Sequence, residues 1–106
     1  MSNFNLTLTS QSFTLPPATA VQIASINASR ELLMLQNTGS ANPATFKFQT
    51  APSSATDGFA LDPASASGGQ GGSLLLDSGR CSIDAIYAYS TLGTTVTVVD
   101  GSPHFI

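Results

Sequence analysis

The sequence predicts an all-β fold, an antiparallel β-sandwich of about eight strands with jelly-roll topology. Short stretches in which apolar and polar residues alternate recur along the 106 residues, and a period of two is typical of half-buried strands. Turn residues separate these stretches about every 8–12 residues, a spacing found in sandwiches, jelly rolls and small barrels. No stretch of useful length has helical periodicity. We therefore expect one core enclosed by strands.

The N-terminal part of the chain predicts short strands with one apolar face. The apolar residues at 4, 6 and 8 alternate with polar ones, which places them on one face of a strand. Residues 13–15 continue this pattern until two prolines end it, because proline offers no donor to a strand ladder. Residues 21–26 form the next candidate strand.

Residues 30–36 predict a strand of a different kind. The run from Leu32 to Leu35 is apolar at every position, so both faces of the strand are apolar. Such a strand is either central and covered on both sides, or its outer face meets another subunit.

The second half of the chain predicts further strands between turn-rich loops. Phe46 and Phe48 share one face of a strand while Lys47 points the other way. β-Branched residues dominate the final stretch, as strand packing favours. The expected strands cover residues 45–49, 59–61, 73–77, 85–90 and 94–100, after an Asn-Thr-Gly-Ser turn at 37–40.

The whole chain, residues 1–106, is long enough for a single β domain with one core. The Gly/Ser-rich segment 64–72 predicts a flexible surface loop, since neither side of it is long enough for a core of its own. We expect the terminal segments 1–15 and 101–106 to act as arms that reach neighbouring subunits.

The composition favours a protein that resides in an assembly. Only 8% of the residues are charged and 42% are hydrophobic, whereas an ordinary soluble domain has about 25% charged residues. Few charges leave a free monomer poorly protected against self-association. A net charge of −3 and a pI near 4.5 also argue against nucleic-acid binding, which needs clustered Lys and Arg.

The sequence gives few indications of the cellular compartment of the protein. The only cysteine, Cys81, rules out an intrachain disulfide and a Cys-based zinc site, and its sequence context predicts a small buried or half-buried thiol. The first residues lack the basic and apolar regions of a signal peptide. No apolar run approaches the roughly 20 residues that cross a bilayer. We expect synthesis in a cytoplasm and no membrane association.

The candidate chemistry is thin. Two of the five aspartates together could serve glycoside hydrolysis, or several could contribute oxygens to a calcium site. Most of the five, however, lie at turns or strand ends, where Asp commonly caps the backbone. The five aspartates are Asp57, Asp62, Asp77, Asp84 and Asp100. The single histidine, His104, has no second ligand at metal-binding spacing, and glycines 68–72 lack a phosphate-loop motif. We expect no catalytic residue, no cofactor and no metal.

Arg30 and Arg80, two of the three cations, lie near acidic residues in the sequence. Arg30 precedes Glu31, and Arg80 lies between Asp77 and Asp84. We expect weak surface ion pairs from Arg30, Lys47 and Arg80. The alternative is that these charges fix the position of the protein against a charged patch of a partner.

Several apolar and aromatic residues are candidate interface residues. Tyr87 and Tyr89 face away from Ile86 and Ala88, and we expect them in the domain core, with an interface as the alternative because tyrosine is common there. Phe105 follows the last expected strand and suggests docking onto a neighbour. The full interface set is Phe4, Leu6, Leu8, Phe13, Tyr87, Tyr89, His104, Phe105 and Ile106.

The order of the central elements resembles that of small virion proteins of tailed bacteriophages. The chain reads LeuLeuMetLeuGlnAsnThrGlySer, PheLysPhe, AlaThrAspGlyPheAlaLeu, SerLeuLeuLeu and AspAlaIleTyrAlaTyrSer in succession, followed by GlyThrThrValThrValVal, across about residues 30–100. The Gly/Ser-rich 64–72 segment departs from that pattern, and residues 1–29 carry no motif of the family. The resemblance implies a capsid decoration or cement protein, a β-sandwich or jelly roll outside the major shell.

Two functions therefore stay open. In the first, the chain is a structural cement protein on the outer surface of the virion, which oligomerises as a dimer or trimer and bridges copies of the major capsid protein. In the second, it is a carbohydrate- or receptor-binding module displayed on the virion. The absence of tryptophan, a strong stacking residue for sugars, weighs against the second.

Overall fold

The strands pair as one long hairpin that has folded over. The computed structural model describes residues 4–64, 71–77 and 82–105. Each antiparallel pair joins a strand from the first half of the chain to one from the second half: the first strand pairs with the last, the second with the last but one, and so on. The pairs are β1 (Phe4–Leu15) with β8 (Thr94–Phe105), β2 (Val21–Ala24) with β7 (Ile86–Tyr89), β3 (Leu32–Asn37) with β6 (Ser73–Leu76), and β4 (Ala44–Phe48) with β5 (Phe59–Leu61).

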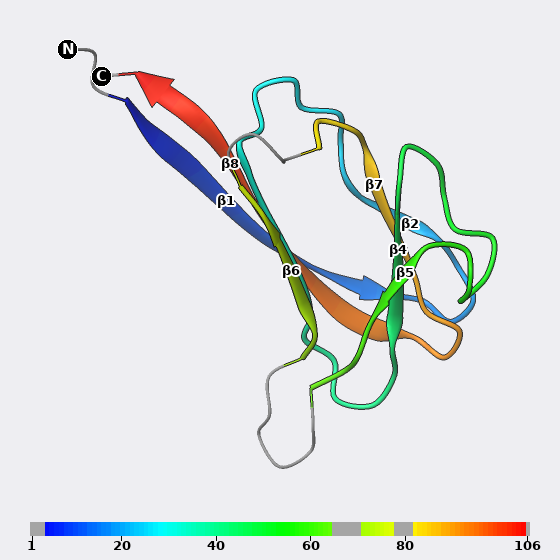
Figure 1. Ribbon diagram of the computed structural model, residues 1–106. Coiled ribbons are helices and arrows are strands. Elements are labelled where there is room, and N and C mark those ends of the chain that lie inside the picture. Colours follow the sequence, from blue (N-terminus) through cyan, green and yellow to red (C-terminus); the bar gives the residue numbers. More distant parts are fainter. Residues whose placement is uncertain (1–3, 65–70, 78–81, 106) are drawn as a thin grey trace.

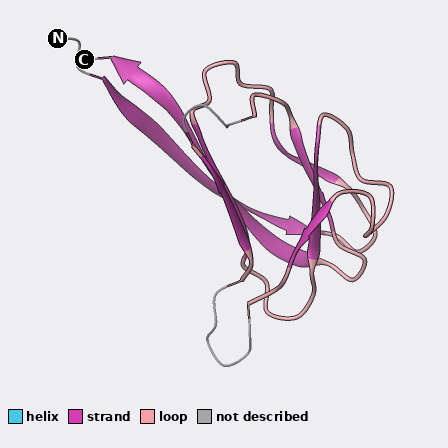
Figure 2. Ribbon diagram, in the orientation of Figure 1, coloured by secondary structure: helices cyan, strands magenta, loops and turns pink. Residues whose placement is uncertain are grey.

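Alternate pairs lie in different layers of the molecule. Sheet A has the strand order β1-β8-β3-β6 and sheet B the order β2-β7-β4-β5 (Figure 1). Figure 2 shows strands and loops only, with no helix among the described residues. Two four-stranded antiparallel sheets with this rolled-up hairpin order form a jelly roll. The predicted fold class is therefore confirmed.

The core lies between the sheets and is built by alternation along each strand. In β3 every second residue, starting at Leu33, is buried, and in β7 the same holds from Ile86. Phe46 is fully buried and stacks on Phe59 with ring centroids 5.6 Å apart. The buried apolar cluster consists of Leu15, Ile23, Leu33, Leu35, Ala44, Phe46, Ile86, Ala88, Val96 and Val98.

Strand β1 is longer than the sequence pattern predicts. It runs unbroken over 12 residues and pairs residue by residue with β8. Leu8 and Phe13 are an odd number of positions apart, so an unbroken strand places them on opposite faces. Leu8 is 58% exposed, whereas Leu15, on the same face as Phe13, is buried. The alternating pattern at 13–15 therefore belongs to the same strand as that at 4–8 but lies on its other face.

Strand β8 also extends beyond its predicted end. It continues past Asp100 to Phe105, and the residues expected to follow the last strand pair with the start of β1. Strand β3 begins opposite Gly101, so the remainder of β1 and β8 forms a two-stranded ribbon that projects from the sandwich (Figure 1). Most of the two expected arms thus lies in paired strands. Whether they reach a neighbour stays a prediction.

A buried arginine joins three parts of the chain at one end of the sandwich. The Arg30 side chain is fully buried, and its Nε donates to Asp100 Oδ2 at 2.9 Å. Its Nη1 donates to the carbonyls of Ser82 and Asp84, both at 2.9 Å, and its Nη2 to that of Ser25 at 2.8 Å. The expectation of a weak surface ion pair with Glu31 is wrong for Arg30. The guanidinium fork instead satisfies loop carbonyls that face it.

A buried asparagine has the same role at the opposite end. Asn37, the last residue of β3, is fully buried. Its Nδ2 donates to the carbonyls of Asn42 and Leu61, at 2.9 and 3.0 Å. Its Oδ1 accepts from the backbone N–H of Gly39 and from Thr94 Oγ1. The predicted turn at 37–40 is therefore held by its own first side chain.

Two glycines are required in turns next to the start of β8: Gly93 in the turn between β7 and β8, and Gly39 in the turn that follows β3. Gly93 has a φ of 90° between β7 and β8, a conformation that side chains rarely adopt. A Cβ on Gly39 would collide with the side chain of Thr94, so only glycine lets this turn approach β8.

Substitution of Arg30 tests the first of these buried networks. We expect Arg30→Met to lower the free energy of unfolding by about 3–5 kcal/mol, because the carboxylate of Asp100 and three carbonyls lose their donor. Urea denaturation measures the loss. Lys47→Met is the matched control: Lys47 pairs with Asp57 at 2.8 Å near the surface, and it should lose much less stability. Equal losses would contradict the role of Arg30.

Candidate functional site

The outer face of sheet A carries a continuous group of apolar side chains. The strand register places Leu8, Val99 and Met34 on this face, away from the core. Leu32 lies across from Gly101, and Leu75 pairs with Met34 on the neighbouring β6. We call these five residues the outer patch: Leu8, Leu32, Met34, Leu75 and Val99. Leu8 and Leu75 are 58% and 59% exposed, so large parts of the patch face solvent.

The outer patch occupies one end of sheet A only. Further along the same face the register brings together Ser12, Thr97, Gln36 and Ser73, and the hydroxyls of Ser12 and Thr97 are hydrogen bonded at 3.0 Å. A sheet face that water covers everywhere would carry such polar residues along its full length. The apolar end therefore departs from the polar pattern of a solvated sheet face.

The outer face of sheet B is covered in part by the chain itself. The loop between β4 and β5 lies over it, since Thr45 Oγ1 donates to the carbonyl of Ala55 at 2.7 Å and Lys47 pairs with Asp57. Tyr87 and Tyr89 point to this outer side, and both are half-buried, whereas Ile86 and Ala88 are buried. The expectation that the two tyrosines lie in the core is therefore wrong.

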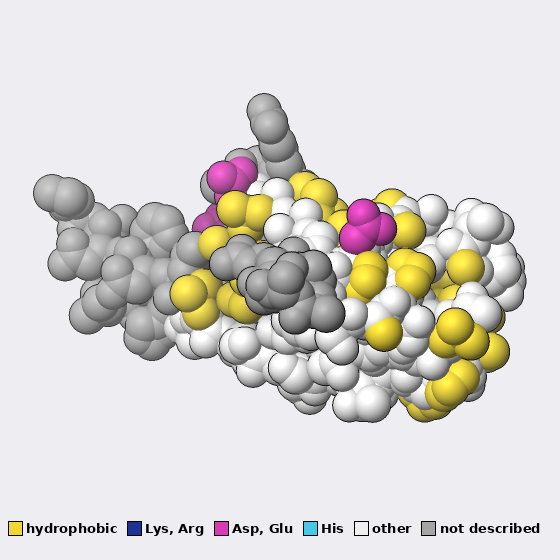
Figure 3. Space-filling model, turned by 90° about the horizontal axis from the view of Figure 1, so that it is seen from below, with side chains coloured by type: hydrophobic (Ala, Val, Ile, Leu, Met, Phe, Trp, Pro, Cys, Tyr) yellow, Lys and Arg dark blue, Asp and Glu magenta, His cyan; other side chains and the backbone are white. Residues whose placement is uncertain are grey.

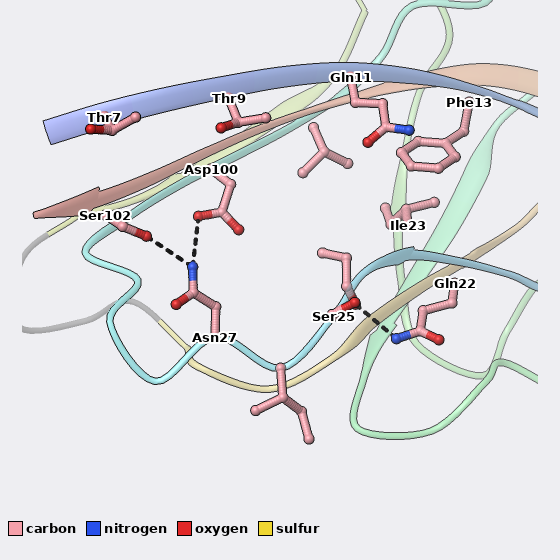
Figure 4. A pocket seen from close by; sticks show the side chains of 13 residues that line it. Thr7, Thr9, Gln11, Phe13, Gln22, Ile23, Ser25, Asn27, Asp100 and Ser102 are labelled. Carbon is pink, nitrogen blue, oxygen red and sulfur yellow. Dashed lines mark hydrogen bonds between the residues drawn. The ribbon is translucent and has the colours of Figure 1, made fainter.

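An open groove lies beside β1, where the edges of the two sheets face each other. It has a volume of about 640 Å³ and is lined by the inner face of β1, by β2 with the residues that follow it, and by β8. We call it the edge groove. Figure 4 shows Thr9, Gln11 and Phe13 along one wall, with Asp100 of β8 beside Thr9 and with Asn27 across from them. Ile23 and Phe13 form its apolar part.

The polar groups of the edge groove are amides, hydroxyls and one carboxylate. Asn27 Nδ2 donates to Ser102 Oγ at 2.9 Å and to Asp100 Oδ1 at 3.3 Å, and Asp100 also accepts from Arg30. These partners already use much of the hydrogen-bonding capacity at that end. The arrangement can hold a polar ligand or a peptide strand, and the side chains that line it contain neither a histidine nor a cysteine.

Three of the described acidic residues are engaged in structural contacts. Asp57 binds Lys47 and Ser53, Asp84 accepts from Ser82 and Gln49, and Asp100 pairs with Arg30. Within residues 4–64, 71–77 and 82–105 no three His, Cys, Asp or Glu side chains are grouped so that they could hold a metal ion. In the same part of the chain no helix is long and apolar enough to cross a membrane.

The predicted interface residues divide between strands. The backbone of Phe4 pairs with that of Phe105, and Asn5 with His104, so Phe4, Leu6, His104 and Phe105 belong to the projecting ribbon. Leu8 lies in the outer patch, and Phe13 packs against the core beside the edge groove. Ile106, Cys81, Arg80 and residues 65–70 of the expected flexible loop lie outside the described residues.

Sequence reasoning missed most of the outer patch. The apolar run 32–35 was the available signal, because half of it had to point away from the core. The structure shows β3 between β8 and β6, with exposed Leu75 beside Met34 on the outer face. Of the two predicted explanations, coverage of both faces by the chain itself does not hold for β3, and contact of its outer face with another subunit stays a prediction.

The surface as a whole has few charges. Figure 3 shows apolar side chains scattered among uncharged ones, with few acidic groups and no basic group in view among the described residues. Large exposed apolar residues outside the outer patch are Ile26, Ile83 and Leu92. This surface matches the low content of charged residues in the sequence.

Comparisons with known proteins give a remote likeness among solved structures. No family model matches the chain, and no curated protein does. A solved structure described as "Bacillus endospore appendages form a novel family of disulfide-linked pili" aligns with 100% of this chain and 91% of its own, at 13% identity and a TM-score of 0.47.

The pair of Lys47 and Asp57 predicts a pH dependence of stability. The hydrogen bond from Lys47, followed by those from the backbone and hydroxyl of Ser53, lowers the pKa of Asp57 from 3.8 to about 2. A pKa that is lower in the folded chain gives stability that is complete above the unfolded value and is lost as the pH falls to the folded value.

We therefore expect Asp57→Asn to be less stable than the natural chain at neutral pH, with a difference that shrinks between pH 3.8 and about 2. Urea denaturation of both proteins across this range measures the difference. A difference that stays constant down to pH 2 would contradict the assigned ion pair.

Proposed function

We propose that this protein is a structural subunit that acts by assembly, as a decoration or cement protein on the outer surface of a phage capsid. One observation carries the proposal: the outer face of sheet A presents the outer patch, while two ion pairs, Arg30 with Asp100 and Lys47 with Asp57, use four of the charged groups within the fold. A surface of this kind acts through buried area and not through chemistry.

The proposed partners are copies of the same chain and the major capsid protein. The resemblance to small phage virion proteins covers the strands that carry most of the outer patch, namely β3, β6 and β8. Full burial of a leucine contributes about 1.5–3 kcal/mol, and Leu8 and Leu75 have more than half of their surface available. Many copies on a symmetric shell add avidity to such modest contacts.

Glycan binding is a second candidate, and the edge groove is the observation in its favour. Its walls present the side-chain amides of Gln11, Gln22 and Asn27 with neighbouring hydroxyls, which are groups that hydrogen bond to sugars. A glycan array with the isolated chain tests this function. Specific binding that Gln11→Ala removes would support it and would favour a receptor-binding role over cement, and a silent array would leave assembly as the function.

Binding to capsids tests the main proposal. Capsids of the phage that encodes the chain, prepared without it, are mixed with the purified protein and sedimented. We expect the natural chain to sediment with them and Leu75→Lys to lower the bound amount by about 10-fold or more at subsaturating concentration, because a charge replaces a buried leucine. Ser73→Lys, on the same strand and face, should bind within about 2-fold of the natural chain.

Two outcomes would overturn the proposal. Failure of the natural, folded chain to sediment with capsids, together with its absence from purified virions by mass spectrometry, would remove the capsid as partner. Equal effects of Leu75→Lys and Ser73→Lys would show that the outer patch is not the contact surface. Thermal unfolding of both variants checks that each remains folded.

A further inference from the structure

The open edge of β1 differs from the other sheet edges of the molecule. Sheets A and B end at β1, β6, β2 and β5. β1 has 12 residues, whereas the other three edge strands have four, four and three. An edge strand exposes unpaired N–H and C=O groups along its length, so β1 offers by far the longest template for another strand.

The β1 edge also lacks the features that keep natural edges apart. Natural edge strands are protected by charged side chains, prolines, bulges or short length. Residues 4–15 contain no charge and no proline, and their register with β8 has no bulge. By contrast, β2 carries an irregularity between Gln22 and Ala24, and the stretch of β8 beyond β3 contains Pro103. The β1 edge is therefore suited to pairing.

We propose that β1 pairs antiparallel with β1 of a second copy of this chain. The proposal rests on the proposed function, of which it specifies the contact between copies. Two observations select this occupant. The free edges of the other described strands are too short to pair along the whole of β1. The absence of charge in β1 means that two copies of a chain with net charge −3 meet here without repulsion between side chains.

Symmetry restricts the register of this pair. A two-fold axis perpendicular to sheet A relates the strands and keeps both outer faces on the same side. Even-numbered residues of β1, which include Leu8 on the outer face, then pair with even-numbered residues. In the longest pairings that this symmetry allows, one residue of β1 stays unpaired. The residue on the axis, which lies opposite the same residue of the second copy, is then either Thr9 or Ser10. Both residues suit this position, since Ser and Thr pair favourably across strands.

The pairing would stabilise the least supported part of the fold and enlarge the outer patch. Two-stranded ribbons are marginally stable alone in water, and the ribbon of β1 and β8 beyond Gly101 would gain a neighbour on its β1 side. The two copies of sheet A would form one continuous sheet. Because both outer faces lie on the same side, Leu8 and the rest of each outer patch would form one apolar surface.

A charge exchange at Ser10 tests the pairing. Ser10 is exposed on the outer face of β1, so Ser10→Lys and Ser10→Glu should leave the monomer folded. Sedimentation equilibrium at low ionic strength should show a dimer for the natural chain. For each variant alone, the dissociation constant of the dimer should be about 3- to 10-fold higher. An equal mixture of the two variants should regain the natural affinity or exceed it, because opposite charges then lie across the axis.

The control repeats the exchange at Ser73 of β6, on the opposite edge of the same sheet. Ser73→Lys and Ser73→Glu should dimerise like the natural chain. A natural chain that is monomeric at every concentration would overturn the pairing. A trimer would also overturn it, since edge pairing about a two-fold axis closes at two copies. A dimer that the Ser10 variants do not change would place the contact elsewhere.

This test is separate from that of the proposed function, because it uses the purified chain without capsids. A dimer that the Ser10 exchange controls, in a chain that does not bind capsids, would overturn the capsid role and support the pairing. Monomers bound singly to capsids would overturn the pairing alone.

Discussion

The guanidinium of Arg30 is the point at which three separate parts of the chain meet. Its four hydrogen bonds join the loop after β2, the residues before β7 and strand β8. A buried cation is costly unless each of its donors is satisfied, so these segments can approach each other only in the arrangement that surrounds it. Asp100 also accepts from Asn27 at the wall of the edge groove, and the ribbon of β1 and β8 begins just after Gly101. The geometry of both candidate surfaces therefore depends on this buried network.

The small number of charged residues connects the fold with the proposed function. A chain with 8% charged residues has few to expose, and the two described ion pairs use Arg30, Lys47, Asp57 and Asp100. What remains outside is a hydroxyl- and amide-rich surface with a few acidic groups and with the outer patch on sheet A. On such a surface, electrostatic repulsion does little to prevent two copies of the protein from associating. In a free monomer this would be a liability, whereas in an ordered assembly it provides contact area.

The fold class and most strands could be predicted because alternation with a period of two is a local signal. Phe46 and Phe48 on one side of β4 with Lys47 on the other follow directly from it, as does the double-sided apolar run of β3. Local patterns could not give the burial of Arg30, since its partners Ser25, Ser82, Asp84 and Asp100 are brought together only by the sheets. The outward position of Tyr87 and Tyr89 was missed because either face of β7 reads as apolar. The outer patch joins residues from four strands, so the strand order had to be known first.

The central claim is that the open edge of β1 becomes paired when the protein assembles. Amide hydrogen exchange along β1, read residue by residue by NMR between Thr7 and Thr14, tests it most directly. In a strand paired on one side, alternate amides donate to the neighbouring strand and the others face solvent. The account predicts that dilute protein protects alternate amides only and that concentrated or assembled protein protects both sets. Rapid exchange of every second amide under all conditions would contradict it.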